Sequence, residues 1–348
     1  MLIPITLFME DFKMKYIKIF LIFIIFFIII IVSGKLVSLK YINDYPEGSF
    51  ISDYYYEENN HDVIFLGDCE AYTSFSPIEL YKEYGITSFV RGSSRQLIGQ
   101  SYYILSETLK YEKPKLVILS VGGIVNTNQI KEEYNRLILD KMKLSREKYE
   151  LYKYSKMDKE NFLTYLFPIL RYHDRITSLN GDDIKYLFKD EVVSHNGFLI
   201  NQNVKPLTVL PTKKNLSSYE INKENIKYLD KIRDLCKDNN ITIILEKSPT
   251  AYPYWYSEYD KQIKDYAIKN NLDYYNFLEM DTNIDYQTDT YDSGTHLNLN
   301  GAKKITRYFG NILKDKYGLQ DHHSNDKINK EYEKKIERYE REINEKNN

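Results

Sequence analysis

The longest apolar run in the chain extends from Ile17 to Val32 and contains a single charge, Lys18. A run of this length can cross the hydrocarbon core of a bilayer as a helix. Lysines lie on both sides of the run, and their mild bias favours an N-terminus inside the cell. We therefore expect residues 1–35 to hold a cytoplasmic end and an uncleaved single-pass anchor in the cell membrane, with the rest of the chain extracytoplasmic. A cleaved signal peptide is the alternative, although no small-residue cleavage site follows the run.

Residues 36–60 are polar and rich in tyrosine, which predicts a stalk that leads to a folded domain at 61–320. In this domain short apolar runs alternate with helical stretches, a pattern typical of βαβ units in a parallel sheet covered on both faces. We predict an α/β fold, a three-layer sandwich with a parallel five-stranded sheet of flavodoxin-like order. In such sheets ligands bind beyond the carboxyl ends of the strands. The expected strands are 62–66, 87–90, 115–121, 241–245 and 272–275.

Two further segments interrupt or follow this alternation. Residues 129–225 lie between the third and fourth strands, and their charged, Leu- and Tyr-rich stretches predict helices. A structureless loop of this length is uncommon, so we expect a helical cap at the mouth of the sheet. Residues 321–348 are highly charged and carry a thin apolar stripe from Ile328 to Ile343, which predicts a helical tail. The stripe fits a solvated helix, and it also fits a short coiled-coil contact with a partner or a second copy.

The overall composition narrows the possible functions. Lys and Arg number 48 and Asp and Glu number 50, so the net charge of −2 gives no overall attraction to nucleic acid. The two cysteines, Cys69 and Cys236, are too few for a disulfide framework or a Cys-based metal site. We expect two separate thiols, and a single disulfide remains open from sequence alone. No metal or organic cofactor is implied.

The first expected strand ends at Gly67, and Cys69 follows two residues later. A glycine permits the tight turn that presents the next residues at the edge of the sheet, as in a nucleophile elbow. A thiol there needs a base, because free cysteine has a pKa of about 8.5. His296 follows the fifth strand and is the candidate base, and Asp292 is the candidate residue to orient its ring. The tetrapeptide 246–249 follows the fourth strand and borders the same edge, and we assign it no role.

These residues resemble the motifs of the SGNH/GDSL hydrolases. Gly67-Asp68-Cys69 resembles the GDS motif, with cysteine in place of serine. Asp292 and His296 resemble the final Asp–His block, and Gly92 matches the block that supplies an oxyanion N–H. Asn126, after Gly122-Gly123, is loosely similar to the G-x-N block. The resemblance covers roughly residues 62–126 and 240–317 and excludes the insertion.

The chain departs from this family at two positions. Cys69 replaces the usual serine, and cysteine paired with histidine is a competent acyl nucleophile. Three residues instead of two separate Asp292 from His296, which puts their contact in doubt. Each residue also has a purely structural interpretation: Cys69 as a small residue in a buried turn, His296 as a helix cap, and Asp292 and Asn126 as turn or loop residues.

The anchor and the outward-facing domain together resemble bacterial envelope-modifying proteins, including the D-alanyl transfer protein of teichoic acids and polysaccharide O-acetyltransferases. This resemblance implies acyl or acetyl transfer, or ester hydrolysis, on an envelope polysaccharide or teichoic-acid-like polymer, with a membrane acyltransferase as a partner. Cys69 would attack, His296 would move the proton, and Gly92 and Asn126 would help to hold the oxyanion. The alternative is a catalytically inactive domain that binds polysaccharide or scaffolds a membrane acyltransferase. A third possibility is a surface protein that acts through its charged tail.

Overall fold

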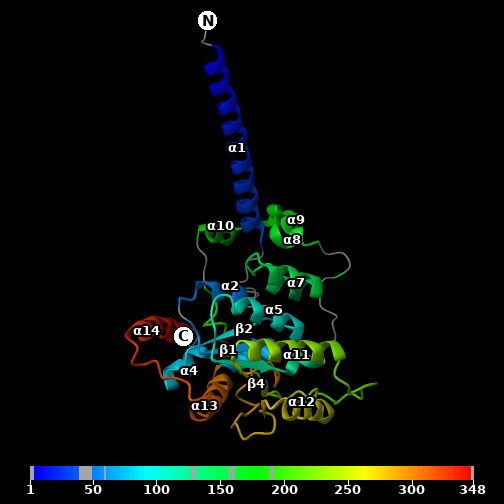
Figure 1. The fold of residues 1–348 in the computed structure, drawn as a ribbon. Coiled ribbons are helices and arrows are strands. Elements are labelled where there is room, and N and C mark those ends of the chain that lie inside the picture. Colours follow the sequence, from blue (N-terminus) through cyan, green and yellow to red (C-terminus); the bar gives the residue numbers. More distant parts are fainter. Residues whose placement is uncertain are drawn as a thin grey trace. The chain divides into compact units, whose positions relative to one another are not determined.

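The computed structural model describes residues 4–38, 49–58, 60–126, 131–155, 157, 161–188 and 192–345. The chain divides into two compact units. We call them the small unit, Met1–Lys40 with Lys159–Glu191, and the sheet unit, Tyr41–Asp158 with Val192–Asn348. Figure 1 labels their helices and strands.

The sheet unit is built on five parallel strands in the order β2-β1-β3-β4-β5. Every residue of the first three strands is buried, and β1 and β3 are nearly continuous apolar runs, whereas β2 also buries Ser88 and Arg91. The order and the parallel pairing confirm the predicted flavodoxin-like arrangement. The strands are β1 (Val63–Gly67), β2 (Ser88–Gly92), β3 (Leu116–Ser120), β4 (Thr242–Lys247) and β5 (Asp273–Asn276).

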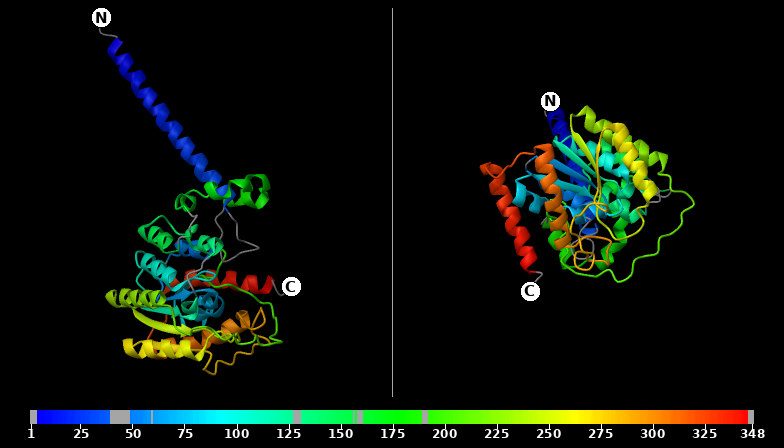
Figure 2. Two further views of the ribbon diagram at one scale, coloured as in Figure 1. Left: turned by 90° about the vertical axis from the view of Figure 1, so that its right-hand side faces the viewer. Right: turned by 90° about the horizontal axis from the view of Figure 1, so that it is seen from below.

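Helices cover both faces of this sheet, as the two further views show (Figure 2). One face carries α3 (Cys69–Ser74), α4 (Pro77–Tyr84) and α13 (Leu299–Tyr317), and the other carries α5 (Ile98–Thr108), α11 (Lys223–Asp238) and α12 (Ser257–Asn270). Local sequence sets their ends, as α4 illustrates. Ser76 accepts a hydrogen bond from the backbone N–H of Glu79, Pro77 opens the helix, and Gly85 closes it at φ 66°.

The predicted stalk is wrong for the part of it that the structure describes beyond the first helix. Residues 50–56 form α2 (Phe50–Asp53) and the 3₁₀ helix η2 (Tyr54–Tyr56), which pack on the sheet unit. Phe50 and Ile51 are fully buried, and the ring of Phe50 meets that of Tyr72 edge-on at 5.0 Å. The segment looked polar because its tyrosines carry hydroxyl groups, yet their rings contribute apolar area to the core. Residues 39–48 and 59 of the expected stalk lie outside the described residues.

The apolar stripe of the tail packs against the same chain over its described length. The tail forms α14 (Asp326–Glu345), whose apolar stripe packs against α4. Tyr332 and Tyr339 are fully buried, and Tyr332 stacks on Tyr81 with ring centroids 3.8 Å apart. The predicted positions of the apolar stripe are correct, and the surface that the stripe covers is α4 of the same chain.

The insertion is not one cap. Its first helices, α6 (Glu132–Leu139) and α7 (Arg146–Ser155), belong to the sheet unit, where α7 packs on α5. Residues 159–191 belong to the small unit, with α8 (Leu163–Leu166), α9 (Ile169–Tyr172), the 3₁₀ helix η4 (His173–Ser178) and α10 (Gly181–Phe188). From residue 192 the chain returns to the sheet unit.

The small unit also contains α1 (Pro4–Val37). Within the described residues, its part from Met14 to Val37 is the one helix long and apolar enough to cross a membrane. A signal sequence near an N-terminus would have the same character, and the side of the membrane on which the chain lies does not follow from the helix.

Candidate active site at the carboxyl edge of the sheet

Cys69 lies at the turn between β1 and α3, on the edge where the strands end. Asp68 caps α3 by accepting a hydrogen bond from the backbone N–H of Glu70 at 3.1 Å. A Cβ at Gly67 would lie 2.6 Å from the Cβ of Ser120 and 2.9 Å from that of Ala71, so no larger residue fits this turn. The turn thus has the build of a nucleophile elbow, with the partly buried thiol of Cys69 at the presented position.

His296 and Asp292 are joined by two hydrogen bonds. The imidazole Nδ1 lies 2.6 Å from Oδ2 of Asp292, and the backbone N–H of His296 donates to Oδ1 at 2.8 Å. The extra residue between them is absorbed by a tight loop, in which Ser293 has φ 64° and Gly294 has φ 97°. The longer spacing therefore does not separate the carboxylate from the ring.

The thiol of Cys69 lies within hydrogen-bonding reach of the His296 ring. Because Asp292 takes Nδ1, the ring nitrogen left to exchange a proton with the thiol is Nε2. The structure thus brings Cys69, His296 and Asp292 together from opposite ends of the chain in the order that a nucleophile, a base and an orienting carboxylate require.

Neighbouring charges act in opposite directions on this group. Burial lowers the pKa of His296, but its hydrogen bonds to Asp292 and Cys69 raise the pKa by more, to well above 6.5. Burial and then the carboxylate of Asp68 raise the pKa of the Cys69 thiol, and His296 offsets only part of this increase. The pKa of Asp68 is itself raised to about 6, by burial and by Glu70. The thiol therefore stays protonated at rest, and the part of the increase in the His296 pKa that comes from a negative charge on Cys69 arises only once the thiol proton has passed to the ring.

The two oxyanion candidates lie around this turn. Gly92 ends β2 directly beside Gly67, and a Cβ there would approach the carbonyl oxygen of Gly67 to 3.1 Å. Asn126 follows the 3₁₀ helix η3 (Gly122–Val125) after β3, and its backbone N–H donates to the carbonyl of Gly123. Both residues therefore lie at the ends of the strands that flank β1.

An ion pair between Glu70 and Lys247 also belongs to this edge, and sequence reasoning missed it. Lys247 Nζ lies 2.5 Å from Oε2 of Glu70 and donates to the carbonyl of Ser248 at 3.1 Å, and the lysine side chain is 2% exposed. A Cβ at Gly122 would meet the same Glu70 oxygen, so a larger residue at this position would push the carboxylate away from its place beside Lys247. The only sequence signal was the position of residues 246–249 after a strand.

Glu246 lies behind this pair and is fully buried. The hydroxyl of Ser248 donates to both of its carboxyl oxygens, at 2.9 and 3.1 Å. Burial raises the pKa of Glu246 to about 7, so near neutral pH the group exchanges a proton beside the Glu70–Lys247 pair. Among the described residues, no group of three or more His, Cys, Asp or Glu side chains is arranged to hold a metal ion.

The second cysteine, Cys236, differs from Cys69 in its surroundings. Cys236 is fully buried in α11, and burial alone raises the pKa of its thiol to about 12. Both cysteines are free, which confirms the expectation of two separate thiols.

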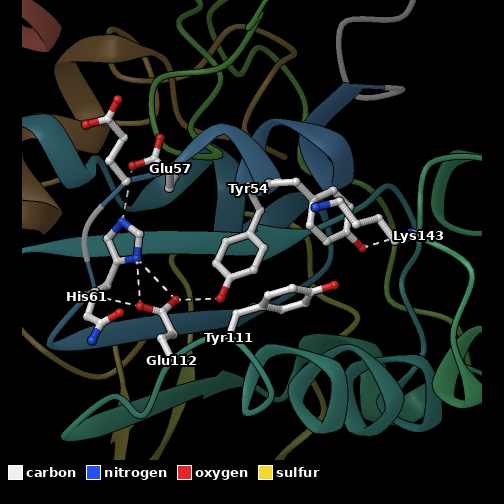
Figure 3. Close-up of a pocket in the computed structure, with 9 residues that line it drawn as sticks. Tyr54, Glu57, His61, Tyr111, Glu112 and Lys143 are labelled. Carbon is white, nitrogen blue, oxygen red and sulfur yellow. Dashed lines mark hydrogen bonds and ion pairs between the residues drawn. The ribbon is translucent and has the colours of Figure 1, made fainter.

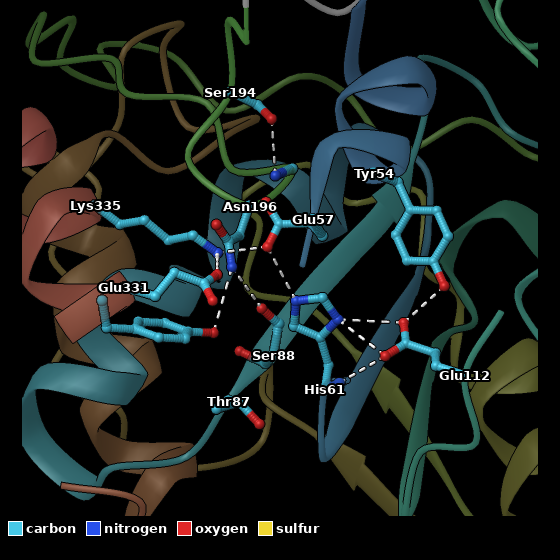
Figure 4. A network of polar contacts seen from close by, with 12 residues as sticks. Tyr54, Glu57, His61, Thr87, Ser88, Glu112, Ser194, Asn196, Glu331 and Lys335 are labelled. Carbon is cyan, nitrogen blue, oxygen red and sulfur yellow. Dashed lines mark hydrogen bonds and ion pairs between the residues drawn. The ribbon is translucent and has the colours of Figure 1, made fainter. Parts of the chain in front are cut away.

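A separate hollow lies near the start of β1, at the opposite edge of the sheet from Cys69 (Figure 3). His61 is one of its lining residues, and it bonds through Nδ1 to Glu112 at 3.1 Å and through Nε2 to Glu57 at 3.3 Å. The network continues from Glu57 to Lys335 on α14 (Figure 4). These groups neutralise one another across three segments of the chain, so we interpret the hollow as part of a structural clamp and not as the place of chemistry.

No protein-family model matches the chain, and no curated protein sequence matches it. Solved structures similar to it include a protein described as lipolytic and of the G-D-S-L family from Desulfitobacterium hafniense (15% identity, 73% of this chain and 100% of the other, TM-score 0.39). Also similar is a family 3 carbohydrate esterase from Clostridium thermocellum (14% identity, 74% of this chain and 96% of the other, TM-score 0.35). A GDSL-like lipase from Bacteroides thetaiotaomicron is similar as well (13% identity, 79% of this chain and 98% of the other, TM-score 0.37). TM-scores this low carry no argument about activity. What the chain itself defines is a class: a parallel α/β protein with a Cys–His–Asp group at the carboxyl edge of its sheet.

Proposed function

We propose that the protein is an SGNH-like, membrane-anchored enzyme that transfers or hydrolyses an acyl or acetyl ester of a cell-envelope polysaccharide. The observation that carries the proposal is the hydrogen-bonded pair His296–Asp292 next to the thiol of Cys69, at the sheet edge where such folds bind ligands. The anchor is α1, and the resemblance of the motifs to envelope-modifying proteins supports the choice of substrate. A membrane acyltransferase would be the partner that supplies the acyl group.

In the proposed mechanism Sγ of Cys69 attacks the acyl carbonyl while its proton passes to His296. Asp292 stabilises the imidazolium that forms. The oxyanion accepts hydrogen bonds from the backbone N–H groups of Cys69 and Gly92 and from the side chain of Asn126. His296 then protonates the leaving alcohol, which leaves a thioester on Cys69. Water or a sugar hydroxyl, deprotonated by His296, attacks the thioester and releases the free thiol.

The test is hydrolysis of p-nitrophenyl acetate by the full-length protein in detergent. Cys69→Ala is expected to reduce the rate to that of the buffer, and His296→Ala to reduce it by roughly 10²- to 10⁴-fold. Cys236→Ala is the matched control and should leave the rate unchanged, since this thiol is buried in α11. A Cys69→Ala variant that hydrolyses the ester as fast as the wild type would refute the mechanism. Addition of an oligosaccharide acceptor then separates transfer from hydrolysis by the product formed.

The second candidate is a catalytically inactive domain that binds polysaccharide or scaffolds a membrane acyltransferase. The observation that favours it is the raised pKa of Cys69, since burial and the carboxylate of Asp68 oppose ionisation. The two candidates differ in the alkylation of Cys69 by iodoacetamide between pH 6 and 10. An enzyme requires that His296→Ala slows this reaction. Equal rates in both proteins, together with no ester turnover, would select the binding domain.

A further inference from the structure

The helix α10 exposes apolar side chains and buries a charged one. Ile184 and Phe188 are spaced to share one face, yet they are 55% and 86% exposed. Asp183, one of its two aspartates, is 1% exposed. A helix in water normally turns its apolar face inward and its charges outward. Large exposed apolar side chains on one face of α10 fit an environment that is apolar on that side.

The buried charge of Asp183 holds α10 to the end of α1. Oδ1 of Asp183 accepts from Nη2 of Arg175 at 3.0 Å. Nη1 of the same arginine donates to the carbonyls of Val37 and Ser38, both at 2.7 Å. These carbonyls are among those that a helix C-terminus leaves without an internal partner, and a cation there is favoured by the helix dipole. Arg175 therefore closes α1 and fixes α10 at the same time.

The covering of α1 starts where its bare apolar stretch ends. Side chains from Met14 to Val32 are exposed almost throughout, whereas Gly34 and Val37 are buried. A Cβ at Gly34 would lie 3.4 Å from Cδ of Pro168, next to α9. At 1.5 Å per residue the bare stretch is roughly 28 Å long, close to the ~30 Å hydrocarbon core of a bilayer.

The other short helices of the small unit share this character, and Figure 1 shows them gathered at the end of α1. Leu163, Leu170 and Ile176 are 48%, 53% and 55% exposed. Together with α10 they give the segment 161–188 several exposed apolar side chains, and its helices contact α1. We call this segment the collar.

We propose that the collar lies in the lipid–water interface of the membrane that α1 crosses, with Ile184 and Phe188 inserted among the lipid headgroups and first acyl carbons. The proposal rests on the anchor that the proposed function assigns to α1, but not on the chemistry of Cys69. An interfacial helix presents its apolar face to the bilayer in this way. The collar then fixes how deeply α1 sits, because its inserted residues resist movement of the helix along its axis.

Quenching of a fluorescent label in liposomes tests the depth of the collar. Phe188→Cys is labelled with an environment-sensitive dye in the full-length protein carrying Cys69→Ser and Cys236→Ala. The expected result is quenching by lipids with a nitroxide near the headgroup and weak quenching by aqueous iodide. Ile268→Cys is the matched control, since Ile268 is an equally apolar, 79% exposed residue on α12 of the sheet unit. Its label should show the reverse pattern.

A label at Ile25→Cys, in the bare part of α1, separates the failure of the anchor from the failure of the collar. If the label at 25 is quenched by lipid but that at 188 is quenched by iodide, the collar lies in water and the proposal is overturned. If the label at 188 is shielded from both quenchers, protein covers it, and the lipid assignment is equally overturned. If neither label at 25 nor at 188 is reached by lipid quenchers, α1 does not cross the membrane and the collar loses its basis.

Discussion

Two carboxylates beside Cys69 oppose the ionisation that a cysteine nucleophile needs. A serine in this place would not ionise before attack, so the carboxylates would cost it little. With cysteine they keep the thiol neutral until His296 takes its proton. The site is therefore expected to work by general base catalysis, as a serine site does, and not through a preformed thiolate.

Asp68→Asn should make Cys69 more reactive. Asparagine caps a helix as well as aspartate does, so α3 should keep its start while the negative charge is lost. The pKa of the thiol should fall, and alkylation at pH 8 should be severalfold faster than in the wild type. Because the pKa of Asp68 is about 6, the difference should shrink as the pH falls toward 6. Unchanged rates from pH 6 to 9 would show that Asp68 does not act on the thiol.

Lys247→Met should act in the opposite direction. The change leaves the charge of Glu70 without its partner, and an unopposed carboxylate next to Cys69 raises the pKa of the thiol further. We expect slower alkylation and slower ester hydrolysis, with both partly restored in the Glu70→Gln/Lys247→Met double variant. Because Lys247 is buried, thermal unfolding is measured in parallel. A double variant no faster than the single one would contradict the electrostatic role.

At the level of loops and helices, the turn 290–296 determines whether the carboxylate of Asp292 reaches the ring of His296. Gly294 has φ 97°, and a Cβ there would lie 2.9 Å from the Cβ of Ala251. Gly294→Ala should therefore displace Asp292 and lower ester hydrolysis at least tenfold, at a strain of about 1–3 kcal/mol. Gly181→Ala is the control, since open space surrounds that glycine. Retention of full activity in Gly294→Ala would show that the loop tolerates the shift.

The sequence predicted the strands well and the connecting segments poorly, for a physical reason. A strand buried on both faces needs only a short apolar run, such as 116–120, and such runs are visible without knowledge of their partners. Cys69 and His296 could be placed at the carboxyl edge of the sheet because each follows a predicted strand in the sequence. The pairing of α14 with α4, and of residues 159–191 with α1, depends on surfaces far away in the sequence. The Glu70–Lys247 pair could not be read either, because its residues are 177 positions apart and form no motif.

For the molecule as a whole, the clamp around His61 links stability to pH. Burial lowers the pKa of His61, but Glu112 and Glu57 raise it by more, to about 9, against 6.5 when unfolded. The protonated ring therefore contributes stability that is fully present below pH 6.5 and is lost as the pH rises through about 9. Tyr54 bonds to Glu112 and Lys335 pairs with Glu57, so loss of the proton from His61 also weakens the support that these two residues receive from the network.

His61→Gln should remove this dependence and destabilise the sheet unit by on the order of 3 kcal/mol at pH 6. The measurement is the free energy of unfolding in urea between pH 6 and 10, followed by aromatic circular dichroism in detergent. His173→Gln is the control, because this histidine is exposed and the aspartate that it pairs with is exposed too. Parallel curves for wild type and His61→Gln would show that His61 does not carry the pH dependence.

The helix α14 also affects when the apolar face of α4 can be covered during synthesis. It packs on Ile78 and Tyr81, and Tyr81 bonds to Asn329, which leaves the ribosome 248 residues later. This face of α4 therefore waits for α14 through most of the synthesis of the sheet unit. A product cut short before Tyr332 would display that apolar face permanently and be recognised by chaperones and proteases.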